Sequence, residues 1–261
     1  MKHLTVLLKK EWLEAGRSYK LLWLPVVFML LGMLQPLVYY YMPQILQMMD
    51  GLPEGLELNL PAYSAEDAMA STLTGQFDQL GLLILVISMM GLIITDKNNG
   101  MLTFISTRNT TLTEYLIGKW IGQAAILAVA IAAGFMMSAL YTSFLYHAVP
   151  ISRLAAGLAV YYVWCLFILT VTLTLGALLS RVSAVAVLSI VLLLTMKTVT
   201  GLGAGFQSFN PAFLSNHAVN LIVAGEVLPH FVLTAVLTFV LIAMLLLLSK
   251  TYLSRKELPS M

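Results

Sequence analysis

Charged residues are scarce in this sequence, and their scarcity points to the class of protein. Asp, Glu, Lys and Arg together make up 10% of the 261 residues, whereas hydrophobic residues make up 60%. A soluble domain usually carries about 25% charged residues. A soluble chain this apolar would expose too much nonpolar surface to remain in solution, so the composition indicates an integral membrane protein.

The residues and motifs of common enzymes are also missing. The single cysteine, Cys165, cannot form a disulfide within the chain. The sequence has no GxxxxGK[ST] phosphate-binding loop and no HExxH motif, and no two histidines or cysteines stand at metal-ligand spacing. We therefore expect no catalytic residue, no bound cofactor and no metal site in this chain, and no nucleic-acid partner.

Long stretches without charge are the main feature that is present. A spanning helix needs roughly 20 apolar residues, because the hydrocarbon layer is about 30 Å thick. Six such stretches predict an all-α integral membrane protein, a single domain over residues 1–261 with six transmembrane helices. The expected spans are about 21–47, 72–95, 115–144, 154–180, 183–201 and 228–249.

Two of the six spans are short because charged residues limit them. Asp78 limits the second span and Lys197 limits the fifth. We expect Asp78 to lie at or just below the outer interface and Lys197 to reach outward to the lipid headgroups. Either side chain could instead face an internal cavity, so both are candidates for a translocation path.

The positions of Lys and Arg predict the orientation, because cytoplasmic loops carry an excess of both. If the N-terminus lies in the cytoplasm, twelve of the fourteen basic residues fall on the cytoplasmic side. Arg153 and Lys197 are the two that fall outside. We therefore expect a multi-pass protein of the plasma membrane with both termini in the cytoplasm.

Residues 2–19 predict an amphipathic helix that lies on the membrane surface before the first span. At 100° per residue, apolar side chains such as Leu8 and Trp12 fall on one arc, and basic side chains such as Lys9 and Lys10 fall on the opposite arc. This pattern is typical of an interfacial helix. An ordinary cytoplasmic amphipathic helix is the alternative.

Residues 96–114 form the largest expected cytoplasmic loop. Threonines near its end can cap the third span, with Glu114 in the first turn of that helix. After the turn residues Asn99 and Gly100 comes a short apolar stripe of Met101, Leu102, Phe104 and Ile105. The stripe has little to bury against within one chain, so it predicts a protein partner.

Residues 202–227 form the last outer segment. Gly203, Gly205 and Pro211 interrupt any long helix there. Residues 212–223 are expected to form a short amphipathic helix at the outer surface.

Together these features resemble the permease subunits of type-2 ABC transporters. The segment KKEWLEAGRS, Lys9 to Ser18, is similar to the elbow helix that precedes the first span in that family. Family members then carry an acidic residue, a turn, Gly-Thr-Leu, a short coupling helix and Leu-Gly-Lys at the start of the third span. This chain has Asp96, Asn99-Gly100-Met101-Leu102, Arg108 and Glu114-Tyr115-Leu116-Ile117-Gly118-Lys119. It departs from the family at Met101, where Thr is usual, and at Asp96-Lys97, where Glu is commoner.

The resemblance implies the transmembrane subunit of an ATP-driven ABC transporter, by family tendency a bacterial exporter. Two permease chains would pair as a homodimer or heterodimer, and a separate ATP-binding subunit carrying ATP and Mg would dock on each. The implied ATPase-docking coupling loop contains Asp96, Asn99, Gly100, Met101, Leu102, Phe104, Ile105 and Arg108. The implied elbow-helix residues are Lys9, Lys10, Glu11 and Trp12.

Two other functions are compatible with six spans. A non-transporting membrane partner, such as an immunity or sensory subunit, would work without an ATPase. A membrane-embedded enzyme would need a polar catalytic cluster inside the bilayer, and the sequence does not indicate one.

Overall fold

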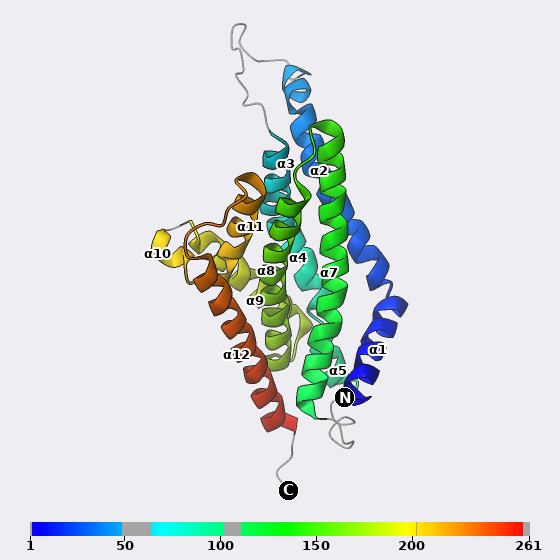
Figure 1. Ribbon diagram of the computed structural model, residues 1–261. Coiled ribbons are helices and arrows are strands. Elements are labelled where there is room, and N and C mark those ends of the chain that lie inside the picture. The colour runs from blue at the N-terminus through cyan, green and yellow to red at the C-terminus, as the bar shows by residue number, and fades with distance from the viewer. Residues whose placement is uncertain (1, 49–63, 102–110, 202, 258–261) are drawn as a thin grey trace.

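The computed structural model describes residues 2–48, 64–101, 111–201 and 203–257 (Figure 1). These residues are mainly helical and include no strand, so the all-α prediction is confirmed. Six stretches among them are long and apolar enough to cross a membrane, which makes the chain a multi-pass membrane protein. They are Lys20–Met42, Ala65–Asn98, Leu112–Leu145, Ile151–Leu178, Val182–Val199 and Phe231–Arg255.

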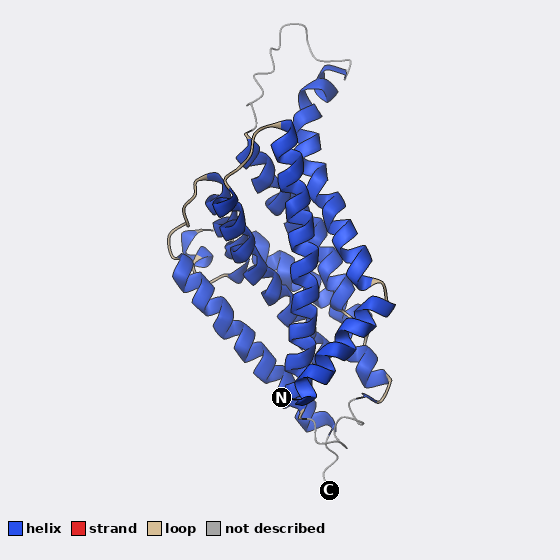
Figure 2. Ribbon diagram, turned by 45° about the vertical axis from the view of Figure 1, so that its right-hand side comes forward, coloured by secondary structure: helices blue, strands red, loops and turns tan. Residues whose placement is uncertain are grey.

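The helices run side by side along the long direction of the molecule (Figures 1 and 2). The N-terminal helix α1 (Lys2–Arg17) leads into α2 (Lys20–Met48). The second span consists of α3 (Ala65–Ser71), the π-helix η1 (Thr72–Gly81), α4 (Leu82–Met89) and α5 (Leu92–Asn98). The other spans are α7 (Leu112–Leu145), α8 (Ile151–Leu178), α9 (Val182–Val199) and α12 (Phe231–Glu257). Between α9 and α12 lie α10 (Ala204–Gln207), the 3-10 turn η2 (Pro211–Phe213) and α11 (Leu214–Val223).

The helix ends follow local capping. The second span begins at Ala65, earlier than the expected residue 72, because Ser64 caps it: the Asp67 amide donates to the Ser64 hydroxyl at 3.1 Å. The third span begins at Leu112, after Thr111 and Glu114 form a reciprocal capping box. The fifth span ends at Val199, where residue 201 was expected.

Helices α2 and α7 cross with their backbones in direct contact. A Cβ atom added at Gly134 would lie 2.6 Å from the Phe28 carbonyl oxygen, and one added at Gly32 would collide with the Gly134 carbonyl. Small residues allow such close approach between spanning helices. The two glycines therefore fix where the first and third spans cross.

Helix α8 is the central element of the bundle. In its most apolar stretch 56% of the residues are buried, against 17% in α9 and in α12. The ring of Tyr161 on α8 lies 6.1 Å from the ring of Phe77, which in turn lies 5.1 Å from Phe28 on α2. These aromatic contacts tie three spans together, whereas most residues of α9 and α12 lie at the surface of the bundle.

The short helix expected in the last outer segment is present as α11. It packs against the bundle beside α8 (Figure 1). Leu214, Ala218 and Ile222 recur every four residues and are fully buried. A Cβ at Gly157 of α8 would lie 2.7 Å from Ile222, so the glycine makes room for this helix. The apolar stripe of α11 is thus used for packing within the protein.

Candidate functional site

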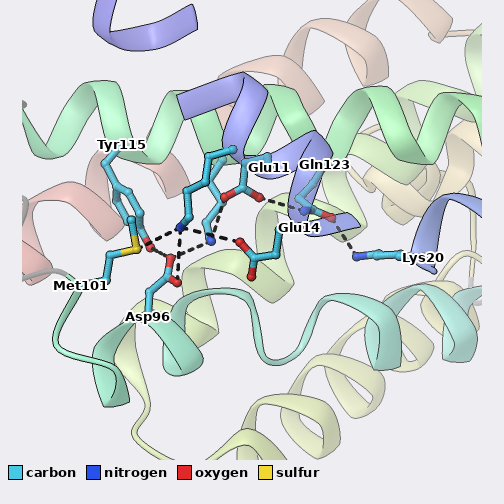
Figure 3. A network of polar contacts seen from close by, with 9 residues as sticks. Glu11, Glu14, Lys20, Asp96, Met101, Tyr115 and Gln123 are labelled. Atoms are coloured by element: carbon cyan, nitrogen blue, oxygen red, sulfur yellow. Dashed lines mark hydrogen bonds and ion pairs between the residues drawn. The ribbon is translucent and has the colours of Figure 1, made fainter. Parts of the chain in front are cut away.

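Three helices meet at a buried charge cluster near the start of the third span. The Lys119 ammonium of α7 donates to Glu11 Oε1 of α1 at 3.1 Å and to Asp96 Oδ2 of α5 at 2.7 Å (Figure 3). The three side chains are 2%, 5% and 6% exposed, respectively. We call Glu11, Asp96 and Lys119 the Lys119 cluster.

Neighbouring polar groups satisfy the two carboxylates of the Lys119 cluster. The Tyr115 hydroxyl donates to Asp96 Oδ2 at 2.5 Å, and the Gln123 amide donates to Glu11 Oε2 at 3.0 Å (Figure 3). Lys10 lies 3.9 Å from Asp96 Oδ1 and also donates to the Met101 sulfur at 2.9 Å. Buried charges are stable when they are paired and hydrogen-bonded, so these contacts hold the three helices in one arrangement.

The sequence of α7 explains why the cluster forms here. Tyr115, Lys119 and Gln123 are four residues apart and therefore share one face of the helix. Gly122 lies beside them and lets α1 approach, because a Cβ at Gly122 would lie only 2.9 Å from the Glu11 Cβ. The polar face of α7 and Gly122 together form the surface against which the N-terminal helix packs.

Lys97 anchors the end of the second span on its other side. Its ammonium donates to the carbonyl oxygens of Gly176 at 3.0 Å, of Leu179 at 3.2 Å and of Ala177, all at the carboxyl end of α8. A cation is favourable there because the last carbonyls of a helix lack internal partners. The segment that leads into the 99–111 loop is therefore fixed to α1 and α7 through Asp96, and to α8 through Lys97.

The structure changes the role expected of Asp96. The family resemblance implies that Asp96 belongs to the ATPase-docking loop. In the structure its side chain is buried and pairs with Lys119 at the base of that loop. Asn99 and Gly100 are exposed, and Gly100 has a φ of 67°, which favours glycine. Leu102, Phe104, Ile105 and Arg108 lie outside the described residues.

The elbow-helix residues divide between surface and interior. Lys9 and Trp12 are exposed, Lys10 is half-buried and Glu11 is buried in the Lys119 cluster. The helix therefore exposes Lys9 and Trp12, while Glu11 and Lys10 contact the bundle.

A second buried charge contact joins Asp78 and Lys197, which we call the Lys197 pair. Lys197 Nζ lies 2.5 Å from Asp78 Oδ2, and the Tyr161 hydroxyl donates to Asp78 Oδ1 at 3.2 Å. Lys197 also donates to the Ser215 hydroxyl and to Asn216 Oδ1 of α11, the latter at 3.3 Å. The pair thus connects the second and fifth spans to α8 and α11.

The expected outward reach of Lys197 was wrong. The Lys197 side chain is 22% exposed and turns inward, because Asp78 is 1% exposed and a buried carboxylate without a partner is costly. Asp78 sits within η1, a ten-residue π-helical segment, and such segments are frequent at functional sites. The two candidate path residues therefore form one site.

Sequence reasoning named Asp78 and Lys197 but did not pair them, and it missed Lys119, Gln123 and Tyr161 as site residues. For Lys119 a signal was available, since Lys119 and Gln123 recur at helical spacing in an apolar stretch. For Tyr161 and its contact with Asp78 there was none, because the two residues come from spans far apart in sequence.

The architecture and the buried charges define an integral membrane protein with six spans and no soluble domain among the described residues. No family model matches the chain. Over 226 residues it is 34% identical to the uncharacterized transmembrane protein YxlG of Bacillus subtilis (strain 168), an alignment that covers 87% of each chain. The chain belongs to the same family as YxlG.

Proposed function

We propose that this chain is the transmembrane subunit of an ATP-driven type-2 ABC transporter, acting as an exporter. A second permease chain and a separate ATP-binding subunit with ATP and Mg would complete the transporter. The chain would lie in the plasma membrane with both termini in the cytoplasm. The observation that carries the proposal is the anchoring of the 99–111 loop at its base by Asp96 and Lys97.

A loop anchored in this way suits the transmission of force. If a partner protein moved the loop, Asp96 would carry the displacement to α1 and α7, and Lys97 would carry it to the end of α8. Separating buried charges is costly, so the connected helices would move as one body. The elbow helix would then act as a lever, because Glu11 joins it to the same cluster.

The Lys197 pair supports a place for the translocation path beside α9. This helix is the fifth span, and little of it is buried apart from its contacts with α8, α4 and η2. In the proposed transporter, movement of α9 away from η1 would open the Lys197 pair and expose both charges to a passing substrate.

Co-purification tests the proposal directly. The tagged chain, isolated from its native host in mild detergent, is expected to bring down a protein with a Walker A motif that hydrolyses ATP. Replacing Leu102 and Phe104 together by Asp should lower recovery of that ATPase at least about tenfold, since one buried apolar side chain is worth about 1.5–3 kcal/mol.

The matched control for this test is Glu226→Lys, a charge change at an exposed site on the far side of the bundle. This variant should recover as much ATPase as the wild type. Two outcomes would favour the immunity or sensory role. One is that the loop variant recovers as much ATPase as the wild type, and the other is full biological function in cells without any such ATPase.

A membrane-embedded hydrolase, the less favoured alternative, would have to use the contact between Lys197 and Ser215. A lysine beside a serine can assist nucleophilic attack. Here Ser215 is fully buried and Lys197 is already paired with Asp78, so the geometry does not favour this function. Labelling by a fluorophosphonate that disappears in Ser215→Ala would nevertheless favour the hydrolase.

A further inference from the structure

A polar cavity of about 330 Å³ lies beside the Lys119 cluster. Its wall is formed by α1, by the start of α2, by the junction of α4 and α5 in the second span, by α7 and by the first residue of α9. The volume falls in the roughly 300–1,000 Å³ range of small-molecule sites. Neither the proposed ATPase contact nor the Lys197 pair uses this cavity. Its main polar lining residues are Glu14, Ser18, Lys20, Ser88, Thr95 and Gln123.

Lys20 provides a buried cation on one side of the cavity. Its ammonium donates to the Ser88 carbonyl oxygen at 2.7 Å. It also donates to Gln123 Oε1 at 2.8 Å (Figure 3). An ammonium has three N–H donors, so these contacts leave one for a ligand. Lys20 is 8% exposed, which strengthens its attraction for an anionic group that enters the cavity.

Glu14 provides an accessible anion in the same cavity. Its carboxylate is 53% exposed and forms an ion pair with Lys10 at 3.7 Å, which is longer than a hydrogen bond. Glu11, the other lining carboxylate, is already bonded to Lys119 and Gln123. The cavity therefore offers one N–H donor on Lys20 and a largely exposed carboxylate on Glu14, whose ion pair with Lys10 involves Oε2. This is the pattern that a zwitterion requires.

The position of the cavity indicates which kind of zwitterionic molecule can reach it. Lys20 is the first residue of the first span, and Thr95 lies in the last turn of the second, so the cavity is at the level where both spans meet the membrane boundary. Ile87 lines the cavity and is 53% exposed, which gives the cavity an apolar edge that faces lipid. A lipid headgroup would enter here with its acyl chains along Ile87.

We infer that this cavity binds the headgroup of a phosphatidylethanolamine-type phospholipid. Its phosphate accepts from Lys20, and its primary ammonium donates to Glu14. Phosphatidylcholine fits less well, because its trimethylated nitrogen has no N–H to donate. Phosphatidylglycerol has the same phosphate but no ammonium, so its negative charge would lie beside two carboxylates without a cation of its own. The bound lipid would fill the gap between α1 and the second span.

Native mass spectrometry of the full chain tests this inference. The protein is released from detergent micelles supplied with equal amounts of phosphatidylethanolamine, phosphatidylcholine and phosphatidylglycerol. We expect one retained phosphatidylethanolamine, and we expect Glu14→Gln to lower its retention about tenfold or more, because a charge-assisted hydrogen bond is worth about 1.5–3 kcal/mol. Glu226→Gln, at an exposed carboxylate away from the cavity, should retain the lipid fully.

A charge reversal makes the test independent of any loss of stability. Glu14→Lys should reverse the lipid preference, so that more phosphatidylglycerol than phosphatidylethanolamine is retained. Equal retention of the three lipids by the wild type, or unchanged selectivity in Glu14→Lys, would overturn the inference. Retention of soluble glycerophosphoethanolamine as strong as that of the intact lipid would also overturn it, because the site would then serve a soluble ligand.

Discussion

Charge is buried at two places in this bundle, and the two places differ in how the charge is held. Lys119 stands between two carboxylates, and Tyr115 and Gln123 add hydrogen bonds to those carboxylates. Lys197 faces one carboxylate, Asp78, and its own side chain is 22% exposed. The three side chains of the Lys119 cluster are therefore almost fully buried, whereas the Lys197 pair has one partner close to the surface.

The helices that the two sites connect also differ in how much of their surface is buried. The Lys119 cluster joins α1, α5 and α7, and α7 is packed along its length against α2. The Lys197 pair attaches α9, in which only 17% of the most apolar stretch is buried. We interpret the first site as a fixed clamp beside the 99–111 loop and the second as the attachment of a helix that can move.

Removing the central cation should give the largest effect. Lys119→Met leaves Glu11 and Asp96 buried without their partner, and breaking a buried ion pair costs about 3–5 kcal/mol. The free energy of unfolding, measured by titration with SDS in mixed micelles, should fall by that amount. Lys250→Met, at an exposed position on α12, is the control and should change it little. A loss below about 1 kcal/mol for Lys119→Met would contradict the enclosed clamp.

The Lys197 pair should respond unequally to the loss of either partner. Lys197→Met leaves Asp78, 1% exposed, without its cation and should cost about 3 kcal/mol. Asp78→Asn should cost about 1 kcal/mol, because the partly exposed Lys197 can turn toward water. The same SDS titration measures both, and the double variant should be more stable than Lys197→Met alone. Equal costs would show that Lys197 is as enclosed as Lys119.

The fold could be predicted from the sequence because its signal is local. Apolar length and the positions of charges identify six spans, and the Thr111–Glu114 capping pair marks the start of the third. For α11 the sequence predicts the helix but not its neighbour, because an apolar stripe of Leu214, Ala218 and Ile222 fits a membrane surface and a protein neighbour equally well. Only the tertiary position of Gly157 decides between them.

The candidate sites could be predicted only in part, because their contacts join distant parts of the chain. A charge in a span indicates a functional or structural polar site, and Asp78 and Lys197 were found in this way. The choice of partner depends on which helices lie side by side. Asp96 shows the limit: its position in the loop motif suggests a docking residue, whereas its burial depends on Lys119, 23 residues further along the chain.

Glycine substitutions can separate each charge site from its packing. Gly122→Leu would push α1 away from α7 beside the Lys119 cluster, and Gly157→Leu would push α11 away from α8 beside the Lys197 pair. Overpacking typically costs about 1–3 kcal/mol. Gly122→Leu should also make α1 more accessible to protease, whereas Gly157→Leu should leave α1 protected. Increased cleavage of α1 in both variants would show that the two sites are not independent.

The smallest expected effect is a pH dependence confined to the side of the Lys197 pair. His217 on α11 is fully buried between the rings of Phe213 and Phe231, and neither ring nitrogen has a hydrogen-bond partner among the described residues. Burial lowers the pKa of His217 from 6.5 to about 4. Between these two pH values the unfolded chain binds the proton and the folded chain does not, so stability rises with pH across this window.

The melting temperature of the purified protein should therefore fall as the pH is lowered from 7 toward 4.5, and His217→Phe should reduce the fall. Other groups also titrate in this range, so the quantity to compare is the difference between the wild type and the variant at each pH. If the difference in melting temperature between the wild type and His217→Phe stays the same from pH 7 to 4.5, His217 gains a proton without leaving its site. That outcome requires a partner that stabilises the imidazolium. Because Ser215 on the same helix bonds Lys197, loosening of α11 by protonation should also weaken the Lys197 pair, while the Lys119 cluster stays intact.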